Sequence, residues 1–184
     1  MNSCIFGEEI GTTMIQTKKV SLQEIEQLQA ISRKTFGETF TDRNTPENMN
    51  KYLTEELSLE KLTNELNNPN AEFYFAIFEK EIIGYLKINF GEAQTEVKDD
   101  NALEIERIYV SKEHHGKKVG QVLFDHAHKI AKEKKLAYLW LGVWEENLKA
   151  ISFYKKNGFE VFDKHLFKLG DDVQQDLLMK LSID

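Results

Sequence analysis

The spacing of hydrophobic residues switches along the chain between the periods typical of strands and of helices. The runs "EFYFAIF" and "EIIGYLKINF" are rich in β-branched and aromatic residues and meet at Glu79-Lys80, which predicts a β-hairpin. From about Val119 the apolar residues recur at intervals of three and four, which predicts an amphipathic helix. Further strands are predicted at "IQTKKV", "LEIERIYV", "YLWLGV" and "DLLMKL". The pattern predicts one α/β domain in which helices pack on a mixed sheet.

Capping signals mark where the other helices begin. Ser21 and Glu24 have the spacing of a capping box, and Thr45-Pro46 supplies a cap followed by proline at the first helical position. A short helix ends at "NNPN", and a last one is predicted from about Leu148 to Asn157. Residues 1–13 show no periodicity, so we expect a loose N-terminal arm followed by a single domain over residues 14–184.

The strand "LEIERIYV" contains a slip in its hydrophobic pattern. Leu103 and Ile105 occupy odd positions, whereas Ile108 and Val110 occupy even ones. Strand side chains alternate between faces, so a regular strand cannot bury both pairs on one side. A β-bulge near Glu106-Arg107 would restore a single buried face. A strand buried on both faces is the alternative.

Composition narrows the possible partners. The formal net charge of −7 argues against a general nucleic-acid binder, and no basic helix-turn-helix pattern is present. It is compatible with a cationic ligand, although such a charge also serves solubility. One cysteine and five histidines without ligand spacing predict no metal site. We find neither a ~20-residue apolar run nor a secretory leader, so we expect no membrane association and a cytoplasmic location.

The stretch "HHGKKVGQVL" places glycines where the helix from Val119 begins. Gly116 and Gly120 let the backbone approach a ligand closely, and a helix N-terminus offers unpaired N–H groups to phosphates. Lys117 and Lys118 add positive charge. The spacing matches neither a P-loop nor a dinucleotide fingerprint. Taken alone, the stretch is more typical of a glycine turn with solvated lysines.

A second stretch, "NLKAISFYKKNGF", changes that interpretation. Together the two resemble the GNAT superfamily of N-acetyltransferases, whose patterns are Q/R-x-x-G-x-G/A and N-x-x-A-x-x-F-Y-x-x-x-G-F. The second pattern is matched at Asn147, Ala150, Phe153, Tyr154, Gly158 and Phe159. In the first, His115 replaces Gln or Arg and Lys118 replaces Gly, so Lys118 is expected to have an unstrained backbone. Segments such as "FGETF" and "GYLKINFGEAQTE" are similar to bacterial polyamine acetyltransferases of the PaiA type, and this resemblance extends from Met14 to the C-terminus.

The resemblance implies a fold, a cofactor and an arrangement of residues around it. The fold is a mixed, mostly antiparallel twisted sheet with helices on both faces and a bulged, splayed central strand. Acetyl-CoA is the implied cosubstrate, with its pantetheine arm along Ile108, Tyr109 and Val110 and an oxyanion stabilised by a backbone N–H near Val110. The residues implied to hold its diphosphate end are His115, Gly116, Lys117, Lys118, Val119, Gly120 and Gln121, and Asn147 is a further implied contact or a simple N-cap.

Two side chains are candidates for proton transfer. Tyr154 matches the position of the family's general acid. A phenol with a pKa near ~10 stays protonated where a thiol of ~8.5 ionises, so it could give its proton to the departing thiolate. It could instead be a core aromatic residue. Glu104 and Glu106 share one strand face, so their repulsion is expected to raise one pKa. Glu106, beside the bulge, is the predicted base, acting directly or through water, with a solvated acidic face as the alternative.

The predicted activity is acetylation of a primary amine of a polyamine such as spermidine or spermine. The rival acceptors are another small amine or a protein amino group, and a CoA-sensing regulator with little turnover is a second class. Trp144 is expected either to line the acceptor pocket or to pack at a strand end. A homodimer is left open. The acidic residues that suit a cationic acceptor are Glu92, Glu96, Asp99, Asp100, Asp171 and Asp172.

Overall fold

The computed structural model describes residues 9–10, 13–169 and 172–183. Most of the arm predicted over residues 1–13 lies outside the described residues. The described part of it, β1 (Glu9–Ile10), pairs antiparallel with β2 (Thr13–Met14). Within the described chain, no helix is both long and apolar enough to cross a bilayer.

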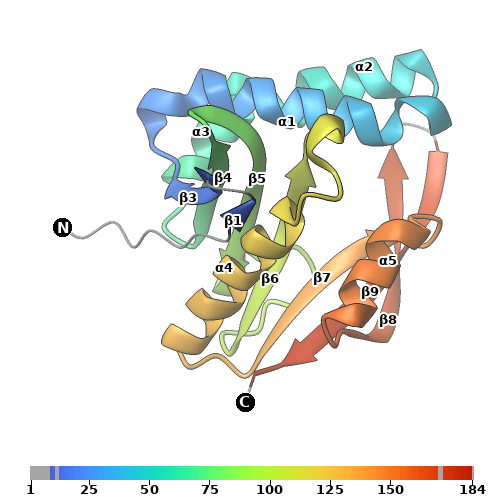
Figure 1. Ribbon diagram of the computed structural model, residues 1–184. Helices are drawn as coiled ribbons and strands as arrows, with labels where there is room; N and C mark the ends of the chain where they lie inside the picture. Colours follow the sequence, from blue (N-terminus) through green and yellow to red (C-terminus); the bar gives the residue numbers. More distant parts are fainter. Residues whose placement is uncertain (1–8, 11–12, 170–171, 184) are drawn as a thin grey trace.

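A seven-stranded sheet forms the centre of the molecule (Figure 1). Its strands follow the order β3-β4-β5-β6-β7-β9-β8, and the one parallel pair among them is β6 with β7. The sheet is therefore mixed and mostly antiparallel, as predicted. The strands are β3 (Gln16–Lys19), β4 (Ala71–Phe78), β5 (Glu81–Phe90), β6 (Ala102–Val110), β7 (Tyr138–Trp144), β8 (Glu160–Leu169) and β9 (Asp172–Ser182).

Helices cover both faces of this sheet, and each face has its own core. Phe73 and Phe75 of β4 pack with buried residues of the first three helices, whereas Tyr74 and Ala76 pack with those of the last two. Because alternate residues of a strand point to opposite faces, the two helix groups lie on opposite sides of the sheet. The helices are α1 (Ile25–Phe40), α2 (Pro46–Glu55), α3 (Leu59–Asn67), α4 (Val119–Glu133) and α5 (Leu148–Lys156).

The local signals of the sequence are found where they were predicted. Ser21 and Glu24 form the capping box, in which Glu24 accepts from the Ser21 N–H at 3.1 Å, and a 3₁₀ turn over Leu22–Glu24 leads into α1. Thr45 Oγ accepts from the Asn48 N–H at 3.2 Å at the start of α2. Glu79 and Lys80 form the β4–β5 turn with φ of 49° and 72°, the positive values that a two-residue hairpin needs.

The predicted bulge is present in β6. Arg107 pairs with Lys87 of β5, but the next residue of β5, Ile88, pairs with Ile105, so Glu106 is the extra residue. The bulge reverses the alternation of β6. Ile108 and Val110 consequently pack against the same core cluster as Leu103 and Ile105. One inserted residue thus keeps four apolar side chains on one face and directs the glutamates of the strand away from that core.

Candidate active site

Strands β6 and β7 separate after a short stretch of pairing. They are bonded only from Ala102–Tyr138 to Glu104–Trp140. Beyond this point β7 remains paired with β9, and β6 remains paired with β5 as far as Val110. Within the described residues, the edge of β6 that faces β7 therefore has no strand partner over its second half. Backbone groups on such an edge can bond an extended ligand as a neighbouring strand would.

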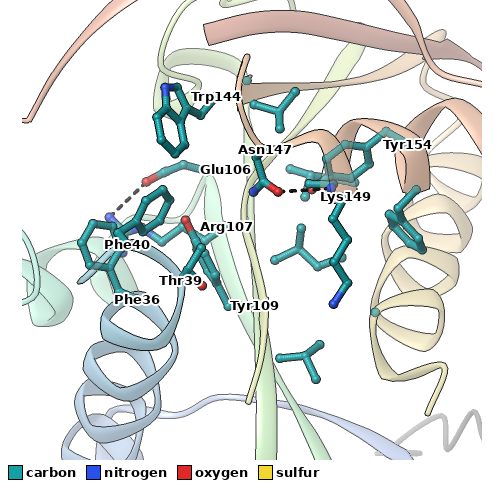
Figure 2. Close-up of a pocket in the computed structure, with 18 of the residues that line it drawn as sticks. Phe36, Thr39, Phe40, Glu106, Arg107, Tyr109, Trp144, Asn147, Lys149 and Tyr154 are labelled. Carbon is teal, nitrogen blue, oxygen red and sulfur yellow. Dashed lines mark hydrogen bonds and ion pairs between the residues drawn. The ribbon is translucent and has the colours of Figure 1, made fainter. Parts of the chain in front are cut away.

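The separation opens a cavity of about 920 Å³. Figure 2 shows its lining, with α1 on one side, α5 on the other and β6 between them. Of the predicted site residues, Lys117 alone is outside the lining. Those that line the cavity are Glu106, Ile108, Tyr109, Val110, His115, Gly116, Lys118, Val119, Gly120, Gln121, Asn147 and Tyr154. The fold thus brings together residues from β6, from the turn before α4 and from α5.

The glycine turn has open space at its glycines, and it precedes backbone amides that bond no carbonyl among the described residues. A Cβ atom added at Gly116 or Gly120 would meet no atom within 4 Å. The first backbone bond of α4 runs from the Val122 N–H to the Lys118 carbonyl at 3.1 Å, so the amides of the three residues before Val122 precede it. Free amides, free space and the positive end of a helix dipole fit a diphosphate group.

The backbone of Lys118 differs from the prediction. It was expected to be unstrained, but Lys118 is the N-cap of α4 with φ of 60° and ψ of 9°, in the left-handed region. The prediction was wrong because the connection between the 3₁₀ turn Lys112–His114 and α4 uses two positive φ values, at Gly116 and Lys118, and the second falls on a residue with a Cβ atom. A side chain in this conformation costs about 1 kcal/mol relative to glycine. The family pattern has glycine at this position, and glycine adopts such a conformation without this cost.

A histidine covers part of the open edge of β6. His115 Nε2 lies 2.9 Å from the Val110 carbonyl oxygen, and Lys149 Nζ lies 3.2 Å from His115 Nδ1. A carbonyl only accepts, so Nε2 carries the proton and donates it, and Nδ1 accepts from the lysine ammonium. Lys149 therefore brings a positive charge from α5 to the side of the cavity that holds the glycine turn.

Helix α5 positions Asn147 and Tyr154. Asn147 is the N-cap, and its Oδ1 accepts from the Ala150 N–H at 3.2 Å. Tyr154 is 7% exposed and lies in edge contact with the rings of Phe153 and Phe159, at 5.4 and 5.6 Å between centroids. Burial raises the pKa of Tyr154 well above its ordinary value. Its phenol therefore remains protonated at neutral pH, and it belongs both to the core and to the cavity wall.

The two glutamates of β6 have opposite pKa shifts. Glu104 is 2% exposed, and burial, aided by the charge of Glu106, raises its pKa although it accepts hydrogen bonds. Burial would also raise the pKa of Glu106, but the positive charges of Arg107 and Lys87 outweigh it and lower that pKa. One raised pKa was predicted for this pair, with Glu106 chosen as the base. The raised pKa is that of Glu104, because Lys87 and Arg107 pack against Glu106 and lower its pKa. Of the two carboxylates, Glu104 therefore binds a proton more readily than Glu106.

An aromatic group closes the cavity on the side of α1. Phe40 lies 6.3 Å from Trp144 and 6.4 Å from Tyr109, centroid to centroid, and Phe36 stacks on Tyr52 at 4.0 Å. All five residues line the cavity. Trp144 was predicted as a candidate for the acceptor pocket. Phe36, Phe40 and Tyr52 were missed, because aromatic residues at helical spacing also describe an ordinary core face.

Charges of opposite sign occupy different parts of the cavity. Lys112 and Lys118 follow the end of β6, and Lys149 of α5 contacts His115 of the same turn. Four of the five lining carboxylates lie around the first half of β6 and on β9, beside Arg107: they are Glu96, Glu104, Glu106 and Asp176. The fifth, Glu38 of α1, lies at the lysine end, where it accepts from the Lys112 N–H at 2.7 Å. Glu96 contacts His165 Nε2 at 3.3 Å, and burial raises the pKa of Asp176. This arrangement suits an anionic ligand at one end and a cationic ligand at the other.

The other acidic residues predicted to favour a cation lie elsewhere. Glu92, Asp99 and Asp100 are outside the cavity lining, and Asp99 instead accepts a hydrogen bond from the Tyr138 hydroxyl at 2.9 Å. Asp171 lies outside the described residues, as does the side chain of Asp172. Among the described side chains, no group of three or more His, Cys, Asp or Glu is placed to hold a metal ion.

The chain is similar to acetyltransferases in both sequence and structure. Residues 25–159 match the family model described as the acetyltransferase (GNAT) family. An uncharacterized N-acetyltransferase of Lactobacillus delbrueckii subsp. lactis is 41% identical over 171 residues, covering 93% of this chain and 99% of that protein. A spermidine N(1)-acetyltransferase of Thermoplasma acidophilum is 30% identical over 153 residues, covering 81% and 90%. The crystal structure of PaiA N-acetyltransferase from Thermoplasma acidophilum in complex with coenzyme A superposes with a TM-score of 0.75 at 28% identity, covering 91% and 98%.

Proposed function

The chain belongs to the GNAT family of acetyltransferases, which use acetyl-CoA as cosubstrate, and we propose that the amine it acetylates is a polyamine such as spermidine or spermine. The observation that carries this proposal is the unequal distribution of charge in the cavity: three lysines outnumber Glu38 after the end of β6, and four carboxylates outnumber Arg107 around its first half and on β9. The 30% identical relative that is named a spermidine acetyltransferase supports the same acceptor class.

The main chain would provide most of the binding for the cosubstrate. The amides of Gly116 and of the first turn of α4 bind the diphosphate, with Lys118 and Lys149 adding charge. Ile108 and Val110 offer backbone groups to the pantetheine arm along the open edge of β6. Since His115 occupies the Val110 carbonyl in the protein alone, its ring moves when that carbonyl accepts a bond from the pantetheine.

Two side chains move the protons of the reaction. Glu104 takes a proton from the substrate ammonium, directly or through water, because its raised pKa gives it affinity for that proton. The free amine nitrogen then attacks the thioester carbon, a C–N bond forms and the C–S bond breaks. Tyr154 gives its proton to the leaving sulfur. Overall the ammonium loses two protons, the thiolate gains one, and one proton is released to solvent.

The far part of the cavity suits a long, flexible cation. Phe36, Phe40 and Trp144 present ring surface to methylene groups, and an ammonium over an aromatic face gains roughly 0.5–2 kcal/mol. Glu96 and Asp176 add negative charge at the same side as Glu104. A polyamine carries both features, methylene segments and several ammonium groups. A short or anionic amine would use only part of this lining.

The test is release of free thiol from acetyl-CoA with a panel of amines. The panel holds spermidine, spermine, a monoamine of matched length and a peptide with a free N-terminus and a lysine, with product masses determined by mass spectrometry. We expect the polyamines to have the highest kcat/KM. Acetylation of the peptide or the monoamine in preference to every polyamine would overturn the acceptor assignment. Binding of CoA without turnover on any amine would identify a CoA sensor instead.

A further inference from the structure

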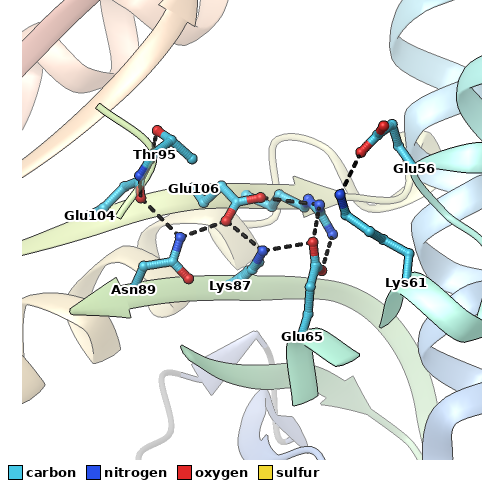
Figure 3. A network of polar contacts seen from close by, with 9 residues as sticks. Glu56, Lys61, Glu65, Lys87, Asn89, Thr95, Glu104 and Glu106 are labelled. Atoms are coloured by element: carbon cyan, nitrogen blue, oxygen red, sulfur yellow. Dashed lines mark hydrogen bonds and ion pairs between the residues drawn. The ribbon is translucent and has the colours of Figure 1, made fainter. Parts of the chain in front are cut away.

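A chain of buried polar contacts extends from α3, through β5, to the cavity (Figure 3). Glu65 of α3 bonds both Lys87, at 3.0 Å, and Arg107, at 2.9 and 3.0 Å. These two cations then bond Glu106, at 2.5 and 3.1 Å. The two glutamates and the two cations balance in charge. Glu104 is left outside this balanced group and connects to it through one residue, Asn89.

Asn89 stands between the two carboxylates of β6. Its Nδ2 donates to Glu104 Oε2 at 2.9 Å and to Glu106 Oε2 at 2.5 Å. The side chain is 1% exposed, and its Oδ1 atom, although buried, has no hydrogen-bond partner among the described residues. Figure 3 shows the nitrogen directed at both glutamates and the oxygen directed away from them. The opposite amide orientation would aim a carbonyl oxygen at two carboxylates, so the observed orientation is the one the network permits.

An unpartnered buried carbonyl destabilises a fold, and buried polar groups in native proteins are rarely left in this state. Asn89 therefore does not satisfy its own hydrogen-bonding capacity, yet it satisfies two carboxylates of the site. Residues that break a local rule of stability in this way are expected at functional positions. Thr95 completes the arrangement from the other side of Glu104, donating from its N–H at 2.9 Å and its Oγ at 2.5 Å.

We propose that Asn89 is a positioning residue for acetyl transfer, whose amide group fixes the Glu104 carboxylate in the cavity wall and holds it apart from Glu106. The inference rests on the proposed role of Glu104 as proton acceptor. Asn89 itself lies outside the cavity lining and acts through Glu104. A neutral donor suits this task. A lysine would place a full positive charge beside Glu104 and lower its pKa, and an aspartate would place a third negative charge beside the two glutamates.

The test is the pH dependence of kcat/KM in Asn89→Leu, a replacement of similar volume without hydrogen-bonding atoms. Loss of the donor removes a bond to the ionised carboxylate, so the acid limb of the profile moves to higher pH. On that limb the rate falls roughly tenfold, the effect of one hydrogen bond to a charged group, while the high-pH plateau stays within about twofold. Glu106, whose charge acts on Glu104, is kept in this variant, and so are the other titratable groups of the lining, among them Glu38, Glu96, Arg107, His114, His115, Tyr154, His165 and Asp176.

Glu65→Gln is the matched control. It alters the other end of the same network, where Glu65 bonds Lys87 and Arg107 but not Glu104. If Asn89 only supports the fold, both variants lower the plateau and the melting temperature and neither moves the acid limb, and the proposal is wrong. Thr95→Val, which removes a hydroxyl donor to Glu104 near the surface, is the second variant. It is expected to move the limb in the same direction as Asn89→Leu if the latter does not fold.

A direct titration separates this inference from the proposed function. Carboxyl ¹³C chemical shifts of glutamate-labelled protein report the protonation of Glu104, assigned with Glu104→Gln, without any turnover. We expect the Glu104 titration to move to higher pH in Asn89→Leu and to stay in place in Glu65→Gln. An unchanged titration would overturn the positioning role even if polyamines are substrates. A moved titration without acetylation of any amine would leave Asn89 correctly assigned and the proposed function wrong.

Discussion

The two ends of the cavity offer different kinds of group to a ligand, main-chain groups at one end and side chains at the other. At the end that follows β6, the groups offered to a ligand are mostly backbone amides and carbonyls, presented by Gly116, the first turn of α4 and the open edge of β6. At the other end they are side chains: the rings of Phe40 and Trp144 and the carboxylate of Glu104. Main-chain groups recognise a shape that does not vary, such as a diphosphate. Side chains change with each substitution, so we expect specificity to be set at this second end, the proposed acceptor site.

The largest expected effect tests the side-chain end at the point of bond breaking. Tyr154→Phe removes the hydroxyl that is proposed to protonate the leaving sulfur, and we expect kcat to fall roughly 100-fold, the lower range for general acid catalysis. The dissociation constant of CoA, measured by calorimetry, is expected to change little, because the ring remains in the core. Unchanged turnover would show that Tyr154 is a packing residue.

The next effect tests the aromatic group against the cosubstrate end. Phe40→Ala and Trp144→Ala each remove ring surface from the acceptor side, and we expect KM for spermidine to rise roughly tenfold in each, with KM for acetyl-CoA unchanged. Steady-state kinetics with each substrate varied in turn provides the measurement. Equal increases in both KM values would mean that the two ends are not independent. Exposed Leu148→Ala, outside the lining, serves as the control.

A smaller effect tests whether the main-chain end needs its empty space. Gly120→Ala adds a methyl group where the free protein has no neighbouring atom, so the fold gains about 0.5–1 kcal/mol of helix stability. The same methyl group intrudes on the proposed diphosphate position, and affinity for CoA is expected to fall about fivefold. A thermal melt and a binding titration measure the two effects, which are opposite in sign. A rise in stability with unaltered affinity would place the diphosphate elsewhere.

The smallest expected effect is on the affinity for CoA, and it distinguishes Lys149 from Lys117. Lys149→Ala removes a charge that lines the cavity, and we expect affinity for CoA to fall about threefold at low salt and less at high salt. Lys117→Ala removes a charge that is exposed and outside the lining, and the affinity is expected to stay the same. Titrations at two ionic strengths compare them. A larger loss in Lys117→Ala would reverse the assignment of charge at this end.

The two ends also differ in how far they can be predicted from sequence. The glycine turn, the α5 motif and the bulge at Glu106 are encoded in short segments, so spacing and parity were enough to locate them. The partners of the bulge are not local: Lys87 lies on β5 and Glu65 on α3, and both approach β6 only after folding. For this reason the cations that lower the pKa of Glu106 were not foreseen when it was chosen as the base, and Asn89 was not recognised at all.

The limited pairing of β6 with β7 has a mechanical consequence for the whole molecule. Three residue pairs of β6 and β7 join two sub-sheets. One sub-sheet consists of β3, β4, β5 and β6, and the other of β7, β9 and β8. An extended ligand bound in the gap would contact both sub-sheets and restrict their motion relative to each other. Amide hydrogen exchange should therefore slow on both sub-sheets when acetyl-CoA binds, including strands far from its contacts.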